Sequence, residues 1–285
     1  MTGTLIADKY ELLDELGNSS GLGVTYKARS RDDGRLVALK VMSVPGDDVN
    51  LKRYEQGIAS ARLLNHPNIV CIIDSGVTAA GKPFYVTDYV EGRTLGEVLK
   101  EVKRMPVARA VALMAQLCDA IDHAHYYGVL HRNLTPDNIL VRQLEDGTES
   151  VHILDLGLAK SFFIANKPDH KLTSAGDIIG TPEYLSPEQC EWKDADWRSD
   201  IYSAGCLLYH MLAGKPPFKG SSKLDTLVKQ VKEKPKDLCK AAGPDAAIPP
   251  AVRDVVMRAL EKDVADRQQT MILLRDELLA AAAGA

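Results

Sequence analysis

The chain has 285 residues, of which 45% are apolar and 26% charged, and a formal net charge of −4. This length can bury one large hydrophobic core or two modest ones, and the charge gives no support for a nucleic-acid or membrane partner. No run of about 18 apolar residues predicts a membrane span, and the first ten residues lack the features of a signal peptide. The cysteines are widely spaced and form no C-x-x-C pair, which predicts reduced thiols in a cytoplasmic protein: Cys71, Cys118, Cys190, Cys206 and Cys239.

Three strands are expected at the start of the chain, over residues 9–17, 24–30 and 36–42. The turn-forming residues 31–34 predict a hairpin between the second and third strands. The two-residue period places Lys40 on the same strand face as Leu36 and Ala38. A buried lysine is costly unless an anion meets it. The alternative is a lysine at the rim of the sheet.

Helices and further strands follow in order. A helix over 49–64 ends at Asn65-His66-Pro67, and strands are expected near 69–76 and 83–88. Pro106 begins a helix whose apolar positions 107, 110, 111, 114, 117, 121 and 124 follow a 3.6-residue period. His123 and His125 in this helix face different ways, so a metal pair is not expected. Later helices are predicted over 222–232, 249–260 and 268–280.

Several short motifs occur in a fixed order. The string from His131 to Leu140 resembles the catalytic loop H-R-D-L-x-x-x-N of protein kinases. The turn from Gly17 to Val24 resembles the G-x-G-x-x-G-x-V loop, and Asp155-Leu156-Gly157 resembles the D-F-G element. The segment 180–188, G-T-P-E-Y-L-S-P-E, resembles the one that ends in A-P-E, as in bacterial serine/threonine kinases.

The resemblance spans nearly the whole chain and implies an α+β, bilobal protein-kinase fold. It implies a five-stranded antiparallel sheet with one helix in an N-lobe of residues 1–87, a hinge over 88–92, and a mainly α-helical C-lobe over 93–285. Fold alone does not establish function.

The same resemblance implies the residues of a site for ATP and Mg²⁺. The catalytic positions are Lys40, Asn133 and Thr135, and the metal ligands are Asn138 and Asp155. The nucleotide would contact Gly17, Gly21, Gly23, Val24, Ala38, Lys40, Thr87, Asp88, Val90 and Leu140. Residues 158–179 occupy the place of an activation loop, in which Thr173 and Ser174 are candidate phosphorylation sites; an ordinary mobile loop is the alternative. Thr181, directly after this loop, is also assigned to the activation segment. Glu188 would pair with Arg267.

Three departures from the family pattern concern the reaction. Asn133 replaces the Asp that accepts the proton of the substrate hydroxyl, and Thr135 replaces a Lys near the γ-phosphate. The helix position of the Glu that pairs with the strand lysine is Gly57. Glu55 lies two residues away, which rotates it by about 200° around the helix. The glycine loop also departs, with Ser20 at the middle glycine position.

Two functions remain open at this point. The first is a pseudokinase that binds ATP and Mg²⁺ weakly or not at all and regulates or scaffolds a protein partner in signalling. The alternative is an active serine/threonine kinase that transfers the ATP γ-phosphate to protein, or an engineered inactive form of one, because Asp to Asn is the isosteric replacement. Gly57 argues against the engineered version.

Overall fold

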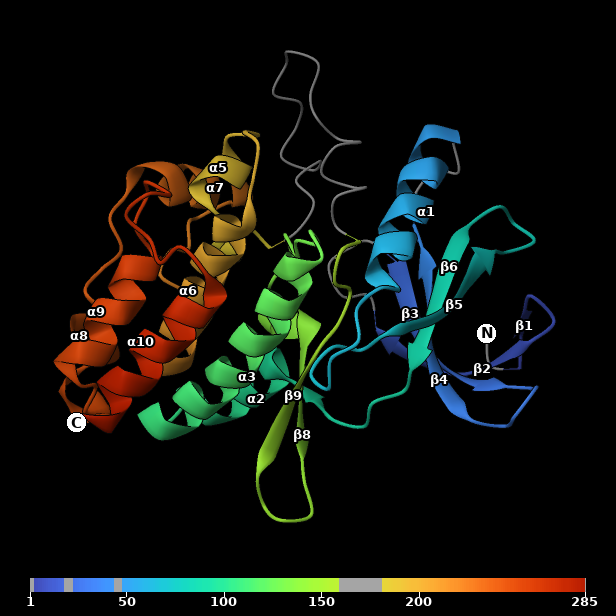
Figure 1. Cartoon of the computed structure of the whole chain (residues 1–285), viewed down its shortest axis with the longest axis horizontal. Helices are drawn as coiled ribbons and strands as arrows, with labels where there is room; N and C mark the ends of the chain where they lie inside the picture. Colours follow the sequence, from blue (N-terminus) through green and yellow to red (C-terminus); the bar gives the residue numbers. More distant parts are fainter. Residues whose placement is uncertain (1–2, 18–22, 44–47, 159–180, 285) are drawn as a thin grey trace.

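The computed structural model describes residues 3–17, 23–43, 48–158 and 181–284. Figure 1 shows two lobes, one built on a sheet and the other mainly on helices, with the chain crossing between them after strand β6. The predicted bilobal α+β fold is therefore confirmed.

The N-lobe is an antiparallel sheet with the strand order β1-β2-β3-β4-β6-β5. Its strands are β1 (Leu5–Ile6), β2 (Tyr10–Gly17), β3 (Gly23–Ser30), β4 (Leu36–Met42), β5 (Ile72–Val77) and β6 (Pro83–Asp88). The expected number of five was one too low, because β1 has only two residues and no alternation can reveal it. Strand β5 begins at Ile72 rather than near residue 69.

Helix α1 (Asp48–Ala61) is the one helix described in the N-lobe and lies along the sheet (Figure 1). Its Tyr54 and Ile58 are buried in a cluster with Met42 and Tyr85 of the sheet and with Leu158. Helix α1 thus presents apolar and aromatic side chains, rather than a carboxylate, to the region between the lobes.

The C-lobe holds the larger hydrophobic core, centred on α3 and α6. Helix α6 begins at the cap residue Asp196, whose side chain accepts from the Arg198 backbone N–H. It ends at Gly214, which has a positive φ of 75° that favours glycine. The α-helices of this lobe are α2 (Leu95–Val102), α3 (Val107–Tyr126), α5 (Pro187–Cys190), α6 (Trp197–Ala213), α7 (Lys223–Lys232), α8 (Leu238–Ala242), α9 (Pro250–Ala259) and α10 (Met271–Ala283).

A small sheet that the sequence reasoning missed lies between the lobes. It consists of β7 (Arg93–Thr94), β8 (Ile139–Gln143) and β9 (Glu149–Ile153), paired in that order. Ile69 makes a parallel bridge with Ile153 and so links the chain before β5 to this sheet. The hairpin β8–β9 connects the predicted catalytic loop to Asp155, which fixes these two motifs relative to each other.

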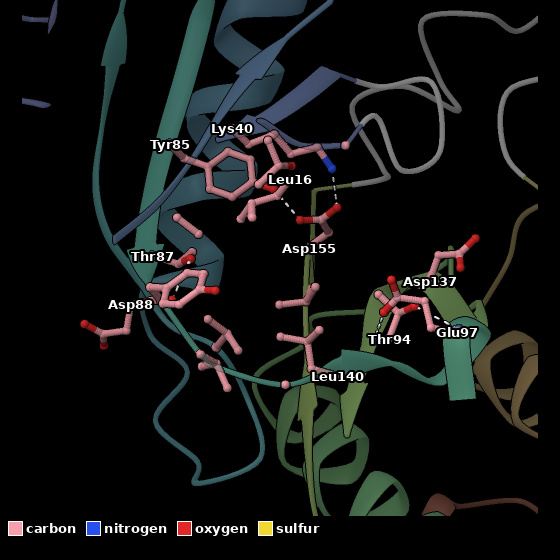
Figure 2. A pocket seen from close by; sticks show the side chains of 18 of the residues that line it. Leu16, Lys40, Tyr85, Thr87, Asp88, Thr94, Glu97, Asp137, Leu140 and Asp155 are labelled. Atoms are coloured by element: carbon pink, nitrogen blue, oxygen red, sulfur yellow. Dashed lines mark hydrogen bonds and ion pairs between the residues drawn. The ribbon is translucent and has the colours of Figure 1, made fainter. Parts of the chain in front are cut away.

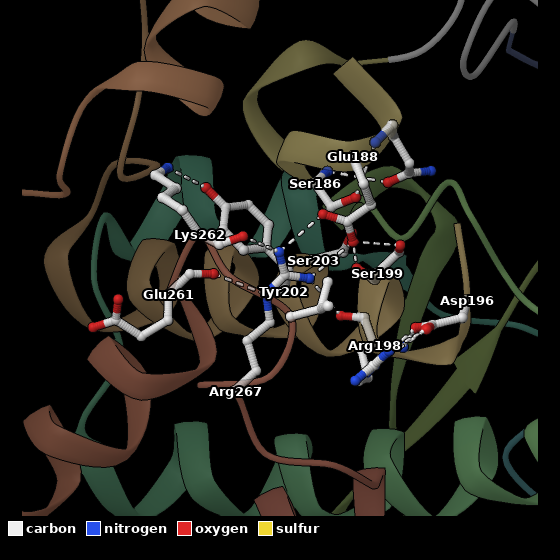
Figure 3. A network of polar contacts seen from close by, with 12 residues as sticks. Ser186, Glu188, Asp196, Arg198, Ser199, Tyr202, Ser203, Glu261, Lys262 and Arg267 are labelled. Carbon is white, nitrogen blue, oxygen red and sulfur yellow. Dashed lines mark hydrogen bonds and ion pairs between the residues drawn. The ribbon is translucent and has the colours of Figure 1, made fainter. Parts of the chain in front are cut away.

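A buried polar network stabilises the C-lobe (Figure 3). The guanidinium of Arg267, which is 0% exposed, donates to both oxygens of Glu188 over 2.8 and 2.9 Å. Arg267 also donates to the backbone carbonyls of Arg198, Glu261 and Lys262. Burial alone would raise the pKa of Glu188, but Arg267 and the Ser199 hydroxyl hold it below its usual value. Glu188, the last residue of the motif, is thereby fixed to the chain before α10.

We expect Arg267→Met to lower the free energy of unfolding by about 3–5 kcal/mol, because it leaves the Glu188 carboxylate buried without its cation. Urea denaturation measures this. The control is Arg93→Met, which removes the exposed ion pair between Arg93 and Glu101 and should leave the midpoint nearly unchanged. Equal effects of the two substitutions would contradict the role of Arg267.

A second prediction concerns pH. Burial lowers the pKa of His210, which lies 2.7 Å from the Tyr184 hydroxyl through Nδ1, to about 4. As pH falls below the unfolded value of 6.5, the unfolded chain binds a proton that the folded chain does not, so stability falls until about pH 4. His210→Gln should therefore flatten the loss of unfolding free energy across this range. Parallel stability curves for the two proteins would refute this.

Candidate active site

A cleft of about 380 Å³ opens between the sheet of the N-lobe and the small sheet β7–β9 (Figure 2). Its volume lies within the range of small-molecule sites. The N-lobe contributes strands β2, β3, β4 and β6, and the C-lobe contributes β8 and the residues after β9. The lining residues are Leu16, Gly17, Thr25, Ala38, Lys40, Val70, Tyr85, Thr87, Asp88, Tyr89, Val90, Gly92, Thr94, Glu97, Lys100, Asp137, Leu140, Leu154 and Asp155.

The charged centre of the cleft is an ion pair between Lys40 and Asp155. Lys40 Nζ donates to one carboxylate oxygen of Asp155, and the hydroxyl of Tyr85 donates to the other oxygen. The side chains of Lys40 and Asp155 are only 3% and 15% exposed. Lys40 is therefore buried and paired with an anion, and the alternative of a lysine at the sheet rim is wrong.

Asp155 is held in an uncommon backbone conformation, with a φ of 58°. The backbone around it is tied to the catalytic loop, because the Leu154 N–H donates to the Asn138 carbonyl over 2.9 Å. Burial alone would raise the pKa of the Asp155 carboxyl, but Lys40 and Tyr85 hold it below its usual value. Asp155 is therefore ionised, and a hydrogen bond to each of its carboxylate oxygens fixes its orientation.

None of the α1 side chains that the structure describes brings a carboxylate to Lys40. Glu55 is exposed, so it does not replace the carboxylate that is missing at Gly57. Gly57 is partly buried, and its carbonyl faces Gly157, the third residue of the D-F-G-like element. The α1 side chains that the structure shows as buried are Tyr54, Ile58 and Ala61. Within the described ranges, Asp155 is the carboxylate that pairs with Lys40.

The catalytic loop is anchored by Asp200, in the first turn of α6. This carboxylate is 1% exposed and accepts from the backbone N–H groups of His131 and Arg132, each over 2.8 Å. His125 Nε2 lies 2.8 Å from the same carboxylate, whereas His123 packs against His66 and Tyr127. Gln189 donates to the Arg132 carbonyl over 2.8 Å. The loop geometry thus depends on its neighbours and not on the side chain at position 133.

The polar residues of the loop are buried. Asn133, Thr135 and Asn138 are 4%, 3% and 0% exposed. The amide nitrogen of Asn138 donates to the Asn133 carbonyl over 2.8 Å, while the side-chain oxygens of Asn133 and Asn138 have no hydrogen-bond partner among the described residues. A buried amide oxygen without a partner is costly unless a ligand meets it.

The residues fit a divalent cation of the magnesium type. Mg²⁺ prefers oxygen ligands and is usually bound by one or two protein groups together with substrate phosphates. The unpartnered Asn138 oxygen and the ionised Asp155 carboxylate are such donors. In the part of the chain that the structure describes, no cluster of three His, Cys, Asp or Glu side chains offers a site independent of phosphate.

Most of the predicted nucleotide residues line the cleft: Gly17, Ala38, Lys40, Thr87, Asp88, Val90 and Leu140. Gly23 and Val24 lie in β3 beside it but are not among the lining residues. Gly21, Thr173 and Ser174 lie outside the described residues. Thr181 directly precedes the 3₁₀ turn Pro182–Tyr184.

Two residues of this site were missed by sequence reasoning. Tyr85 lies on the same strand face as Thr87, two residues away, and that period could have indicated that it faces the cleft. Asp200 belongs to none of the motifs noted in the sequence. A carboxylate inside an otherwise apolar segment was the available signal for a buried anchor.

A bilobal fold with a lysine–carboxylate pair in the cleft between its lobes is the arrangement shared by the class of protein-kinase folds. The family model of the protein kinase domain matches residues 10–279, and the chain therefore belongs to the protein kinase family.

Named relatives agree with this class. The chain is 35% identical over 282 residues to the serine/threonine-protein kinase pkn3 of Myxococcus xanthus, covering 98% of this chain and 51% of that protein. It is 35% identical over 288 residues to the serine/threonine-protein kinase PknB of Mycobacterium leprae, covering 96% and 43%. The crystal structure of the Mycobacterium tuberculosis PknI kinase domain matches with a TM-score of 0.75 at 25% identity, covering 99% of each chain. The chain thus spans about half or less of the length of these two curated relatives.

Among the described residues, no helix has the length and apolar character needed to cross a bilayer.

The close approach of β3 and β4 at the edge of the cleft requires a glycine. A Cβ added at Gly23 would lie 2.3 Å from the Val41 carbonyl oxygen and 2.9 Å from the Met42 Cα, both in the backbone of β4. Gly23→Ala should therefore separate the strands and cost about 1–3 kcal/mol of unfolding free energy, measured by thermal or urea unfolding. Gly284→Ala is the control, since its Cβ would meet only an ordinary contact of 3.7 Å. An equally small effect at both positions would contradict the strand contact.

Proposed function

We propose that this chain is an ATP- and Mg²⁺-dependent protein serine/threonine kinase domain that transfers the γ-phosphate to a hydroxyl of a protein substrate. The observation that carries the proposal is the buried Lys40–Asp155 pair inside a cleft of nucleotide size. The names of the relatives support the choice of Ser/Thr as acceptors. A cytoplasmic location is part of the proposal, because ATP is the donor.

Each site residue would either position the reactants or stabilise charge, and these two effects supply most of the catalysis in phosphoryl transfer. Lys40 and the loop over 17–23 would hold the phosphates, and the hinge backbone at Asp88 and Val90 would meet the base. Asn138 and Asp155 would hold Mg²⁺, which supplies charge neutralisation at the phosphate oxygens. Thr135 would lie near the γ-phosphate.

Asn133 determines how well the reaction proceeds. Its side-chain oxygen is buried and has no partner in the described parts of the chain, so it can accept a hydrogen bond from a substrate hydroxyl. An amide does not accept the proton itself near neutral pH. A general base typically contributes 10²–10⁴-fold, or roughly 3–5 kcal/mol of barrier. The hydroxyl becomes acidic only late in a loose transition state, so we place the loss near the lower value.

The second candidate is the pseudokinase, which the sequence analysis placed first. Asn133 and the missing helix carboxylate at Gly57 favour it. Against it, Lys40 keeps a buried anionic partner, and the named relatives are serine/threonine kinases. In this second case, the same cleft would bind nucleotide to set the lobe arrangement that a protein partner recognises.

The two candidates are separated by transfer of ³²P from the γ-position of ATP to the chain itself and to casein. We expect slow, Mg²⁺-dependent labelling of Ser or Thr, identified by phosphoamino-acid analysis. Asn133→Asp should raise the rate by about 10²-fold, because it restores the base.

Lys40→Met is the control for contaminating kinases and should abolish the label. Nucleotide binding is followed in parallel by thermal shift, where ligand at 100 times its dissociation constant adds about 2.7 kcal/mol. Nucleotide binding without any label, in both the natural chain and Asn133→Asp, would overturn the kinase proposal and leave the pseudokinase.

A further inference from the structure

Tyr85 is the feature of the cleft that the family motifs do not account for. Strands β4 and β6 are antiparallel, and their register places Lys40 directly opposite Tyr85. Residues opposite each other in such a pair extend from the same face of the sheet. Figure 2 shows both side chains reaching down from the N-lobe to Asp155.

We propose that Tyr85 is a positioning residue that fixes the orientation of the metal-binding Asp155, which itself replaces the missing helix carboxylate as the anionic partner of Lys40. The inference rests on the proposed function, because it assigns Asp155 to Mg²⁺. It concerns a different residue from any that the motifs identify.

The need for such a residue follows from the contacts of Lys40. In the family pattern a carboxylate on the helix holds the lysine, and here the helix presents Tyr54 and Ile58 instead. Asp155 therefore has to pair with Lys40 while keeping an orientation in which it can bind a metal. A carboxylate bonded only to Lys40 could turn toward the ammonium group, and the second bond, from Tyr85, prevents this rotation.

The side chains packed around Tyr85 hold its ring in a fixed position. The residue is 3% exposed and packs with Met42, Tyr54, Ile58 and Leu158, so its ring has little freedom. Its hydroxyl donates to one carboxylate oxygen of Asp155, while Lys40 donates to the other.

Groups that hydrogen-bond to a metal ligand orient it, and their loss typically costs 10–100-fold in metal affinity or activity. Each oxygen of Asp155 accepts one hydrogen bond from the chain, which leaves a lone pair on each for a cation. Tyr85 and Lys40 thus orient the carboxylate without blocking it.

The experiment compares Tyr85→Phe with Tyr54→Phe. Both substitutions remove one buried hydroxyl from the same apolar cluster, but the Tyr54 hydroxyl has no hydrogen-bond partner in the described structure. The readout is the stabilisation of each protein by ADP or AMP-PNP in a thermal shift assay as Mg²⁺ is titrated, with a series in EDTA. Melting without nucleotide reports any general loss of stability.

For Tyr85→Phe we expect the half-saturating Mg²⁺ concentration to rise 10–100-fold, with nucleotide binding in EDTA unchanged. Tyr54→Phe should keep the Mg²⁺ dependence of the natural chain. An unchanged or lower Mg²⁺ requirement in Tyr85→Phe would overturn the proposal, and the lower requirement would identify the hydroxyl as a competitor of the metal. An equal loss in EDTA would also overturn it, by showing that the cleft itself had changed.

Failure of this inference is distinct from failure of the proposed function. If the natural chain transfers phosphate and Tyr85→Phe keeps its Mg²⁺ dependence, the positioning role alone is wrong. If the natural chain binds Mg²⁺ and nucleotide without transferring phosphate, the kinase proposal fails and the Tyr85 experiment retains its meaning.

Discussion

The burial of Lys40 is the constraint on which the rest of this structure depends. A lysine on a central strand of the N-lobe, almost without solvent contact, has to meet an anion. The anion is Asp155, which follows the last strand of the small sheet between the lobes. One ion pair therefore joins the two lobes across the cleft and keeps a charged centre at its base, where phosphates and a metal can bind.

The catalytic loop depends on a second buried carboxylate. Asp200 accepts hydrogen bonds from two consecutive backbone N–H groups of this loop. The side-chain amide of Asn138 donates to the backbone carbonyl of Asn133 within it. Neither contact involves the side chain at position 133. With Asn at that position the backbone of the loop keeps these contacts. In the proposed kinase reaction Asn133 cannot take up the proton of the substrate hydroxyl, a step that typically contributes 10²–10⁴-fold of an acceleration that in enzymes reaches 10⁶–10¹⁷-fold.

The sequence predicted the fold well wherever local patterns were long. The apolar period of α3 and the hairpin between β3 and β4 lie where they were expected. Short elements were missed: β1 has two residues, and the sheet β7–β9 is built from segments whose pairing is not local. Motif order singled out Lys40 and Asp155, because each lies within a recognisable short motif, and the structure brings these two side chains together in the cleft.

Tyr85 could not be found in this way, since its role arises from the register between β4 and β6. That register depends on how the strands pair in space, and no spacing along the chain encodes it. The same applies to Asp200, whose contacts join residues nearly 70 positions apart in the sequence.

Counting departures from a motif consequently overstates how much function is lost. The family pattern has a Glu at the helix position of Gly57. The physical requirement is only that an anion lies within reach of the Lys40 ammonium group. Asp155 meets this requirement, and Tyr85 supplies the second hydrogen bond that keeps Asp155 oriented. The loss at position 57 is thus compensated by residues from a strand and a loop. In the proposed kinase reaction the loss at position 133 is of a different kind, because an amide oxygen can accept a hydrogen bond but does not take up the proton near neutral pH.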